Sequence, residues 1–357
     1  MPAITPEPIL KIAMGFMAAK FLFAASEIGL FEALADGPAS TDEIATRIAV
    51  PQRTTGIVLA AMVSLGLIEH EGTRYRNSAA AATFLAGKPG RDLRSYLRHS
   101  DRINYLAWSK LSEALRHEQS QFPELNHEQQ SLFSACVEEF TATAATALVN
   151  AYDFSRHRRL LDVAGGTGSF LLTILRHYPT LKGTLFELPN VCAVERERLA
   201  KEPEQARIAI IEGDALRSSL PKDHDAVLVA NAIHMFSVAH NQEPLHKIRA
   251  AAEAGTHLLL VDLWTDPTHS QPLPAVLMSG QFLLVSGEGQ SYAEQEADGW
   301  LIRLAGASST THHLQGQSAS LSRRRCSTSW TNHFSFTRGG CCDGQGTVDD
   351  EPVRETS

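Results

Sequence analysis

The sequence predicts an α/β protein whose main domain is built around a parallel β-sheet and follows a largely helical N-terminal region. From about residue 158, short apolar stretches of strand length alternate with helical segments, as in a parallel sheet with right-handed crossovers. A glycine-rich turn at residues 164–168 joins the first of these strands to a helix. Earlier in the chain, apolar residues recur mainly at helical spacing. The strands expected are 159–163, 183–186, 208–211, 226–229 and 257–261.

The composition argues against several classes of protein. The chain has 357 residues, of which 43% are hydrophobic and 20% charged, as expected for a globular protein of about two domains. Its net charge of −8 gives no reason to expect nucleic acid or an anionic membrane as a partner. We expect no membrane span, because no long apolar run is uninterrupted, and we recognise no signal peptide. The five cysteines match neither a zinc site nor a disulfide framework, so we expect no metal centre and a reduced, cytoplasmic location.

Residues 1–90 have the element order of a winged helix. Helical spacing is followed by a capping-box pattern, Ser40-Thr41-Asp42-Glu43, and by a further amphipathic helix. Residues 67–75 then alternate around a turn and predict a hairpin. A DNA-reading helix would be basic, yet residues 51–65 contain only Arg53 as a basic residue. We therefore expect a winged-helix-like domain, with a DNA-binding regulator as the less favoured interpretation of it.

The remaining chain divides into three parts. Residues 91–155 are expected to form a helical linker and a lid over the substrate, and residues 156–306 the domain that holds the sheet. Residues 307–357 are rich in Ser, Thr, Arg and Gly, and neither the strand period nor the helix period persists there. We expect a disordered tail and a sheet whose last strands are missing. Natural divergence and a shifted reading frame would each explain such a change.

The turn after the first strand predicts a nucleotide-like ligand. Asp162 lies in the strand, and Gly165, Gly166 and Gly168 precede the helix. Glycines let the backbone approach a ligand closely, and the free amides of a helix start bind polar groups. A dinucleotide loop would need glycine in place of Leu171, and the lysine of a phosphate loop is absent, so a pyrophosphate ligand is disfavoured. An ordinary tight turn is the alternative.

Acidic residues follow the next two strands. Glu187 ends the second strand, where a carboxylate can accept hydrogen bonds from ribose hydroxyls, and Asp214 lies just beyond the third. In open α/β sheets, ligands bind at the carboxyl ends of the strands, so these residues and the glycine turn are expected at one edge. A surface glutamate and a turn-forming Gly-Asp pair are the alternatives.

These motifs together resemble those of the class I small-molecule O-methyltransferases of the caffeic acid, acetylserotonin and bacterial polyketide or phenazine type, over about residues 8–306. The resemblance implies a Rossmann-like methyltransferase domain, S-adenosylmethionine as cofactor and a homodimer formed through the N-terminal domain. It also implies that the glycine loop holds the methionine part, Glu187 the ribose and Asp214 the adenine. The cofactor-binding residues expected are Asp162, Gly165, Gly166, Gly168, Glu187, Asp214, Ala215 and Asn231.

A histidine after the fourth strand is the candidate general base. His234 matches the family's catalytic histidine, although the family often has His-Asp-Trp where this chain has His-Met-Phe. Histidine suits the removal of a proton from a hydroxyl because its pKa lies near neutral pH. The resemblance implies two acidic partners for this base. Asp262 matches the first, and Glu288 is near the second, with its register uncertain by one residue.

The expected reaction is methylation of a hydroxyl on a small aromatic secondary metabolite, as the resemblance implies. A pocket for an aromatic ring should be lined by apolar side chains. The candidates for this lining are Trp108, Phe170, Met235, Met278 and Phe282. Some relatives of the family bind the same cofactor but catalyse hydroxylation or decarboxylation. The presence of His234 favours methyl transfer over those reactions.

Overall fold

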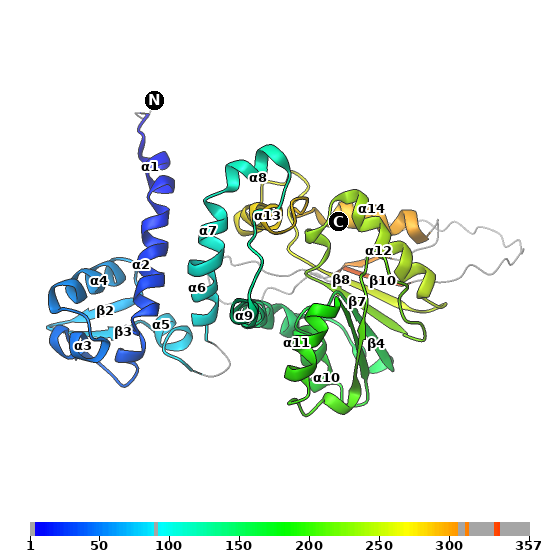
Figure 1. The fold of residues 1–357 in the computed structure, drawn as a ribbon, viewed down its shortest axis with the longest axis horizontal. Coiled ribbons are helices and arrows are strands. Elements are labelled where there is room, and N and C mark those ends of the chain that lie inside the picture. The colour runs from blue at the N-terminus through cyan, green and yellow to red at the C-terminus, as the bar shows by residue number, and fades with distance from the viewer. Residues whose placement is uncertain (1–3, 89–91, 306–310, 314–331, 336–357) are drawn as a thin grey trace, which may run out of the picture.

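The computed structural model describes residues 4–88, 92–305, 311–313 and 332–335. Two compact regions are joined by a group of helices (Figure 1). The N-terminal region holds a small antiparallel sheet in the order β1-β3-β2. Its elements are α1 (Glu7–Ala13), α2 (Gly15–Glu27), β1 (Ala39–Ser40), α3 (Thr41–Ile48), α4 (Gln52–Ser64), β2 (Ile68–Glu71), β3 (Arg74–Asn77) and α5 (Ala79–Phe84).

The predicted capping box and hairpin of the N-terminal region are both present. The Ser40 hydroxyl accepts from the Glu43 amide at 3.3 Å, and the Glu43 carboxylate accepts from the Ser40 amide at 2.6 Å, so α3 begins where expected. β2 and β3 pair in antiparallel register. Behind them, one apolar core includes Phe31, Ile44 and Leu59, all fully buried.

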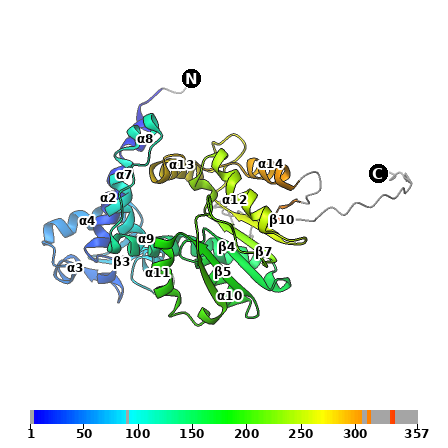
Figure 2. The same cartoon turned by 45° about the vertical axis from the view of Figure 1, so that its right-hand side comes forward.

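A group of helices links the two regions. They are α6 (Arg94–His99), η2 (Ser100–Asn104), α7 (Tyr105–Trp108), α8 (Leu111–His117) and α9 (His127–Ala151). Asn126 begins α9 with a capping box to Gln129, which gives the helix a fixed start. Helix α9 packs on α6 and on α10 (Ser169–His177). Figure 2 shows α9 between the N-terminal region and the second region. The helix therefore connects the N-terminal region with the sheet.

The large sheet has five parallel strands in the order β6-β5-β4-β7-β8, as the sequence predicted. These strands are β4 (Arg159–Val163), β5 (Lys182–Glu187), β6 (Ile208–Glu212), β7 (Ala226–Ala230) and β8 (His257–Val261). Helices α9, α10 and α11 (Pro189–Leu199) bury one face, and α12 (Val238–Ala251) and α14 (Glu294–Ala305) bury the other. Neighbouring side chains of β4 show the alternation, since Leu160 joins the first core and Leu161 the second.

Two further strands follow β8, which corrects the expectation that the sheet lacks its last strands. β10 (Asn332–Ser335) pairs antiparallel with β8, and β9 (Thr311–His313) pairs with β10. Strands of three and four residues are too short for an alternating pattern to be recognised, and β10 pairs with a strand that is distant in sequence. The rest of the expected disordered tail lies outside the described residues.

Among the residues that the structure describes, two helical stretches are long and apolar enough to cross a membrane by length and composition, Glu7–Glu27 and His127–Ala151. Charged or polar residues interrupt both stretches, so neither was predicted as a membrane span. The second is α9, which packs between α6 and α10 as a core helix does. The first comprises α1 and α2 and is mostly exposed, so its apolar surface needs a separate explanation.

A buried polar cluster lies at the edge of the sheet where β4 and β8 begin. The Tyr152 hydroxyl lies 2.7 Å from Nε2 of His157 and 2.9 Å from Nδ1 of His257. His157 is 6% exposed, and burial, followed by the neighbouring His257, lowers its pKa to about 4. The neutral imidazole is therefore the form that the fold accommodates.

This cluster predicts a loss of stability in acid. A histidine in the unfolded chain takes up a proton near pH 6.5, whereas folded His157 resists it down to about pH 4. Its contribution is thus complete above pH 6.5 and declines as the pH falls, by about 2 kcal/mol between about pH 7.5 and about pH 5. Urea unfolding at the two pH values, on the wild type and on His157→Gln, measures this difference. The exposed His246→Gln variant is the control, and equal pH dependence in all three proteins would contradict the prediction.

Candidate active site

The glycine loop 164–168 leaves the carboxyl end of β4, at the centre of the parallel strands. Ala164, Gly166 and Gly168 have φ of 54°, 54° and 66°, which is the left-handed region. Gly165 is required for a different reason, because a Cβ there would lie 2.5 Å from the Asp162 carboxyl group. A Cβ on Gly166 would meet no atom within 4 Å, so this side of the loop is open.

Two buried carboxyl groups lie beneath the loop. Asp162 is fully buried, and neither of its oxygens has a hydrogen-bond partner in the described part of the chain. Burial, together with the charge of Glu187, raises the pKa of Asp162 to about 7. Burial also raises the pKa of Glu187, although its oxygens accept from the amides of Gly166 at 2.9 Å and Leu188 at 2.7 Å. Glu187 thus ties the end of β5 to the glycine loop.

Asp214 stands at the same edge of the sheet, after β6. The Gly213 amide donates to the Glu187 carbonyl at 2.9 Å, which places this turn beside the end of β5. The Asp214 carboxylate accepts from the Leu216 amide at 2.8 Å and pairs with Arg217 at 3.2 Å. It therefore also caps its own turn, which was the alternative role considered for it.

The two remaining candidates of the cofactor set, Ala215 and Asn231, follow β6 and β7 at the same edge of the sheet. Ala215 follows Asp214 and packs against the core formed with α12 and α14. Asn231, with φ of 52°, ends β7 and donates its amide to the Val261 carbonyl at 2.7 Å. The candidate cofactor residues thus come from β4, β5, β6 and β7, all at their carboxyl ends.

The candidate base is held by a buried carboxylate. His234 lies in a short 3₁₀ turn, Ile233–Met235, after β7, and is 7% exposed. Its Nδ1 lies 2.5 Å from Oδ1 of Asp262, at the end of β8, and its ring stacks on Phe282 with centroids 3.6 Å apart. The described residues provide no hydrogen-bond partner for Nε2. Asp262 therefore fixes the ring through one nitrogen and leaves the other available.

The structure does not bring Glu288 to His234. The Glu288 carboxylate pairs instead with Nδ1 of His240, at 2.8 Å, in the first turn of α12. The adjacent loop does reach the base through Gly289, where a Cβ would lie 2.4 Å from the His234 carbonyl. The residue that lies beside His234 is thus Gly289, one position after the predicted Glu288, and it carries no carboxylate.

Four of the five apolar candidates lie on the elements around His234. Phe282 contacts it directly from α13 (Leu273–Ser286), and Met278 lies one turn earlier on that helix. Met235 is the next residue along the chain, and Trp108 ends α7, which packs on α13. The Trp108 ring lies against Gly280 of α13.

Phe170 is placed elsewhere. It is 5% exposed and belongs to the core that α9 and α10 form against the sheet, with Leu148 and Leu171 among its members. An apolar residue at the start of a helix has the same sequence pattern in a core as in a pocket, so this difference could not be seen from the sequence.

Two polar residues that the sequence analysis did not single out position these side chains. Asn241 of α12 is fully buried, and its amide donates to the carbonyls of Ile233 at 2.9 Å and Phe236 at 3.3 Å, which secures the turn that carries His234. Gln281 of α13 accepts from Nε1 of Trp108 at 2.7 Å. A polar residue within the apolar face of each helix is the signal that would have indicated them.

Comparison with protein families gives two matches along the chain. A model described as an O-methyltransferase domain matches residues 108–307, more than half of the chain. A model described as an O-methyltransferase dimerisation domain matches residues 10–87. The two matches follow the two regions of the fold.

Similar curated proteins and solved structures agree with these matches. The chain is 34% identical to 3-hydroxy-5-methyl-1-naphthoate 3-O-methyltransferase of Streptomyces sahachiroi, over 85% of this chain and 90% of that protein. It is 28% identical to the N,N-dimethyltransferase OxyT of Streptomyces rimosus, over 83% and 89%. A structure of PigF with SAH superposes with a TM-score of 0.81 at 25% identity, covering 94% of this chain and all of that one. Human N-acetylserotonin methyltransferase in complex with SAM gives 0.79 at 23% identity, with coverage of 94% and 99%.

Proposed function

The chain belongs to the family of S-adenosylmethionine-dependent O-methyltransferases with an N-terminal dimerisation domain, and on that premise we propose that it methylates a hydroxyl group of a small aromatic acceptor with His234 as the general base. The observation that carries the proposal is the buried His234–Asp262 pair at the carboxyl end of the sheet. It supplies an oriented base at the edge where ligands of open α/β sheets bind.

The loop and the carboxyl groups beneath it suit S-adenosylmethionine. This cofactor is positively charged, and a positive charge near Asp162 and Glu187 stabilises their ionised forms, which burial otherwise penalises. Gly166 leaves one side of the loop open, and Asp214 lies beside the end of β5. We assign the methionine part to loop 164–168, the ribose to Glu187 and the adenine to the turn at Asp214. When bound there, the cofactor supplies an electrophilic methyl group on sulfonium.

The His234 ring is arranged to take a proton from the acceptor. A phenol, with a pKa of about 10, is a weak nucleophile at neutral pH, and a positioned base accelerates such a reaction by roughly 10²–10⁴-fold. Asp262 holds the proton-bearing Nδ1 and stabilises the imidazolium that forms, so Nε2 receives the proton. The stacked Phe282 fixes the plane of the ring. The chain's own residues thus orient the base and stabilise its charge.

The surroundings of His234 favour an aromatic acceptor. Phe282, Met278, Met235 and Trp108 lie on the elements that meet at the base, and apolar side chains suit a planar ring. The naphthoate methyltransferase that the chain resembles carries an aromatic substrate in its name, which supports the same class. OxyT makes an amine acceptor the main competitor. A buried His–Asp pair favours the hydroxyl, because a neutral amine attacks without first losing a proton.

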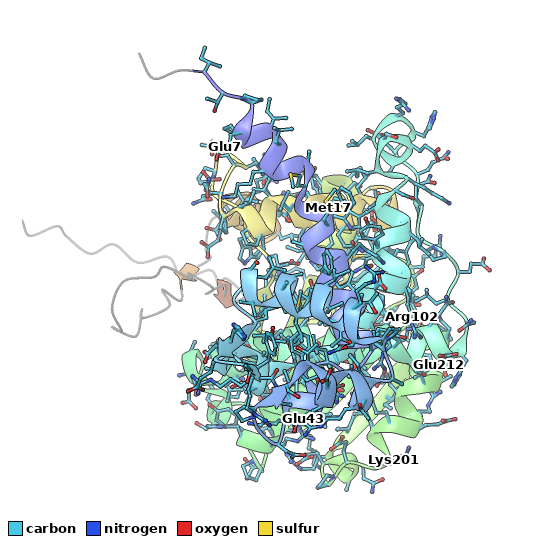
Figure 3. The ribbon with its side chains drawn as sticks, turned by 90° about the vertical axis from the view of Figure 1, so that its left-hand side faces the viewer. Glu7, Met17, Glu43, Arg102, Lys201 and Glu212 are labelled. Carbon is cyan, nitrogen blue, oxygen red and sulfur yellow. The ribbon has the colours of Figure 1, made fainter. Side chains whose placement is uncertain are left out.

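The exposed apolar helices at the N-terminus support a homodimer. Figure 3 shows α1 and α2, from Glu7 past Met17, projecting beyond the rest of the N-terminal region. Ile12 is 82% exposed and Phe16 51% exposed, and an apolar face of this kind marks an interaction surface. The others on this face are Ile9, Leu10, Met14 and Met17. We assign this face to a second copy of the chain.

Removal of the base separates catalysis from cofactor binding. His234→Ala and Asp262→Asn are expected to lower kcat by at least about 100-fold, since each removes a part of the oriented base. The affinity for S-adenosylhomocysteine should be unchanged, because neither side chain belongs to the assigned cofactor set. Turnover with a panel of phenols and aromatic amines, read by mass spectrometry, together with calorimetric binding, measures both quantities. A fully active His234→Ala variant would show that the base is another residue.

Cofactor binding should weaken as the pH falls. At about pH 6, one unit below its pKa of about 7, only about a tenth of Asp162 is ionised, so binding of the positively charged cofactor should be roughly tenfold weaker than at about pH 8. Asp162→Asn should bind more weakly at the higher pH and lose most of this dependence. Calorimetric titrations with S-adenosylmethionine at the two pH values provide the test. A variant with the wild-type pH slope would mean that another group titrates.

The apolar N-terminal face is tested through the oligomeric state. Ile12→Asp and Phe16→Asp place a charge on the surface assigned to the partner and should give a monomer that keeps its secondary structure. Size-exclusion chromatography with light scattering gives the mass. Lys182→Glu, at the start of β5, changes charge away from this face and is the control. A dimer that survives both aspartates would place the interface elsewhere.

A further inference from the structure

An arginine that belongs to none of the predicted motifs donates a hydrogen bond to the backbone of the glycine loop. Arg198, in the last turn of α11, donates from Nη2 to the carbonyl of Thr167 within the loop. Its Nε donates to the Glu195 carboxylate at 2.6 Å, and its Nη1 lies 3.4 Å from the Glu138 carboxylate on α9. One guanidinium group therefore joins the loop, α11 and α9.

Burial fixes the position of this arginine. Glu195 is fully buried, and only one of its oxygens has a partner among the described residues, which is the oxygen bonded to Arg198. A buried carboxylate needs a counter-charge, so Arg198 is held close to it. The Arg198 side chain is itself only 22% exposed, compared with 51% for Arg176 on α10. Water therefore has little access to replace Arg198 as the hydrogen-bond donor to the Thr167 carbonyl.

The bond to Thr167 acts at the point where the loop becomes a helix. The peptide between Thr167 and Gly168 is fixed on both sides, because its carbonyl accepts from Arg198 and its amide donates to the Gly165 carbonyl at 2.8 Å. Gly168, with φ of 66°, then begins α10. At the other end of the loop, Glu187 accepts from Gly166. In the described part of the chain, Arg198 is the side chain that bonds to the Thr167 carbonyl.

We infer that Arg198 is a positioning residue for S-adenosylmethionine, which holds the loop in its cofactor-binding conformation through the Thr167 carbonyl and uses Glu195 as its counter-ion. The inference rests on the proposed assignment of loop 164–168 to the cofactor. The planar fork of arginine bonds to a carboxylate and a carbonyl in fixed directions at once. The ammonium of lysine is a compact charge and retains only the ion pair.

The experiment separates the loop contact from the ion pair. Arg198→Lys keeps the counter-charge of Glu195 but loses the fork, so S-adenosylhomocysteine should bind about tenfold more weakly by calorimetry, with an equal rise in KM for S-adenosylmethionine. The kcat at saturation, the acceptor KM and the melting temperature should stay near wild-type values. Glu195→Gln loses the charge but keeps a side-chain oxygen that can accept from Nε of Arg198, so the fork stays at the loop and binding should remain near that of the wild type. Arg176→Lys, which alters a surface ion pair of α10, is the matched control.

A second variant removes the risk that an unpaired charge unfolds the protein. Glu195→Gln together with Arg198→Met removes both charges, so no buried ion remains, and it should show the same loss of binding as Arg198→Lys. Wild-type binding by Arg198→Lys or by the double variant would overturn the inference and leave Arg198 as a counter-ion only. Gly166→Val tests the underlying assignment separately. If this variant also binds normally, the loop is not the cofactor site and the proposed function fails at that point.

Discussion

The reversal of strand order beside β4 is the constraint on which the site depends. From β4 the chain crosses to β5 and β6 on one side, and later returns to β7 and β8 on the other. The connections that follow the neighbouring strands β4 and β7 therefore lead in opposite directions and keep the space between their carboxyl ends clear of crossing chain. The glycine loop, Glu187, the 3₁₀ turn with His234 and the end of β8 all face this space because each directly follows a strand. No single residue creates the site, since the order of pairing brings together the glycine loop after Val163 and the end of β8 at Val261, which lie far apart in the sequence.

Two kinds of buried carboxyl group serve different ends there. Asp162 and Glu187 lie beneath the loop, and burial raises the pKa of both. The charge of Glu187 raises the pKa of Asp162 further, and a positively charged ligand would relieve this cost. Asp262 instead has a partner of its own, because it contacts His234 through both the ring and the backbone amide. Asp162 and Glu187 thus favour a cationic ligand, whereas Asp262 orients the base His234. Strand β7 lies between β4, which carries Asp162, and β8, which is followed by Asp262, so the two functions are kept apart.

The sequence was sufficient for the parts of the structure that depend on local pattern. Each of the five parallel strands lies within a residue or two of its predicted range, and the capping box begins α3, because period and cap chemistry act over a few residues. The resemblance to the family suggested Asp262 as a partner of His234, and the structure places the two residues after the neighbouring strands β7 and β8. Glu288 and Phe170 were harder, since a loop register and the inward or outward face of a helix are set by packing. β9 and β10 are too short to carry a pattern, and Arg198 meets Thr167 only through tertiary structure.

Helix α9 packs against both regions of the molecule. Within one turn, Glu139 accepts from the Tyr96 amide of α6 at 3.0 Å, Thr141 shares a hydrogen bond with Ser169 at 2.9 Å, and Glu138 approaches Arg198. The first of these contacts belongs to the helices next to the dimerisation domain, and the other two belong to the start of α10 and the support of the loop. A rotation of the N-terminal region about α9 would either break the contact with Tyr96 or also displace the contacts with Ser169 and Arg198. One turn of α9, through Glu138, Glu139 and Thr141, therefore couples the position of the N-terminal region to the support of the glycine loop.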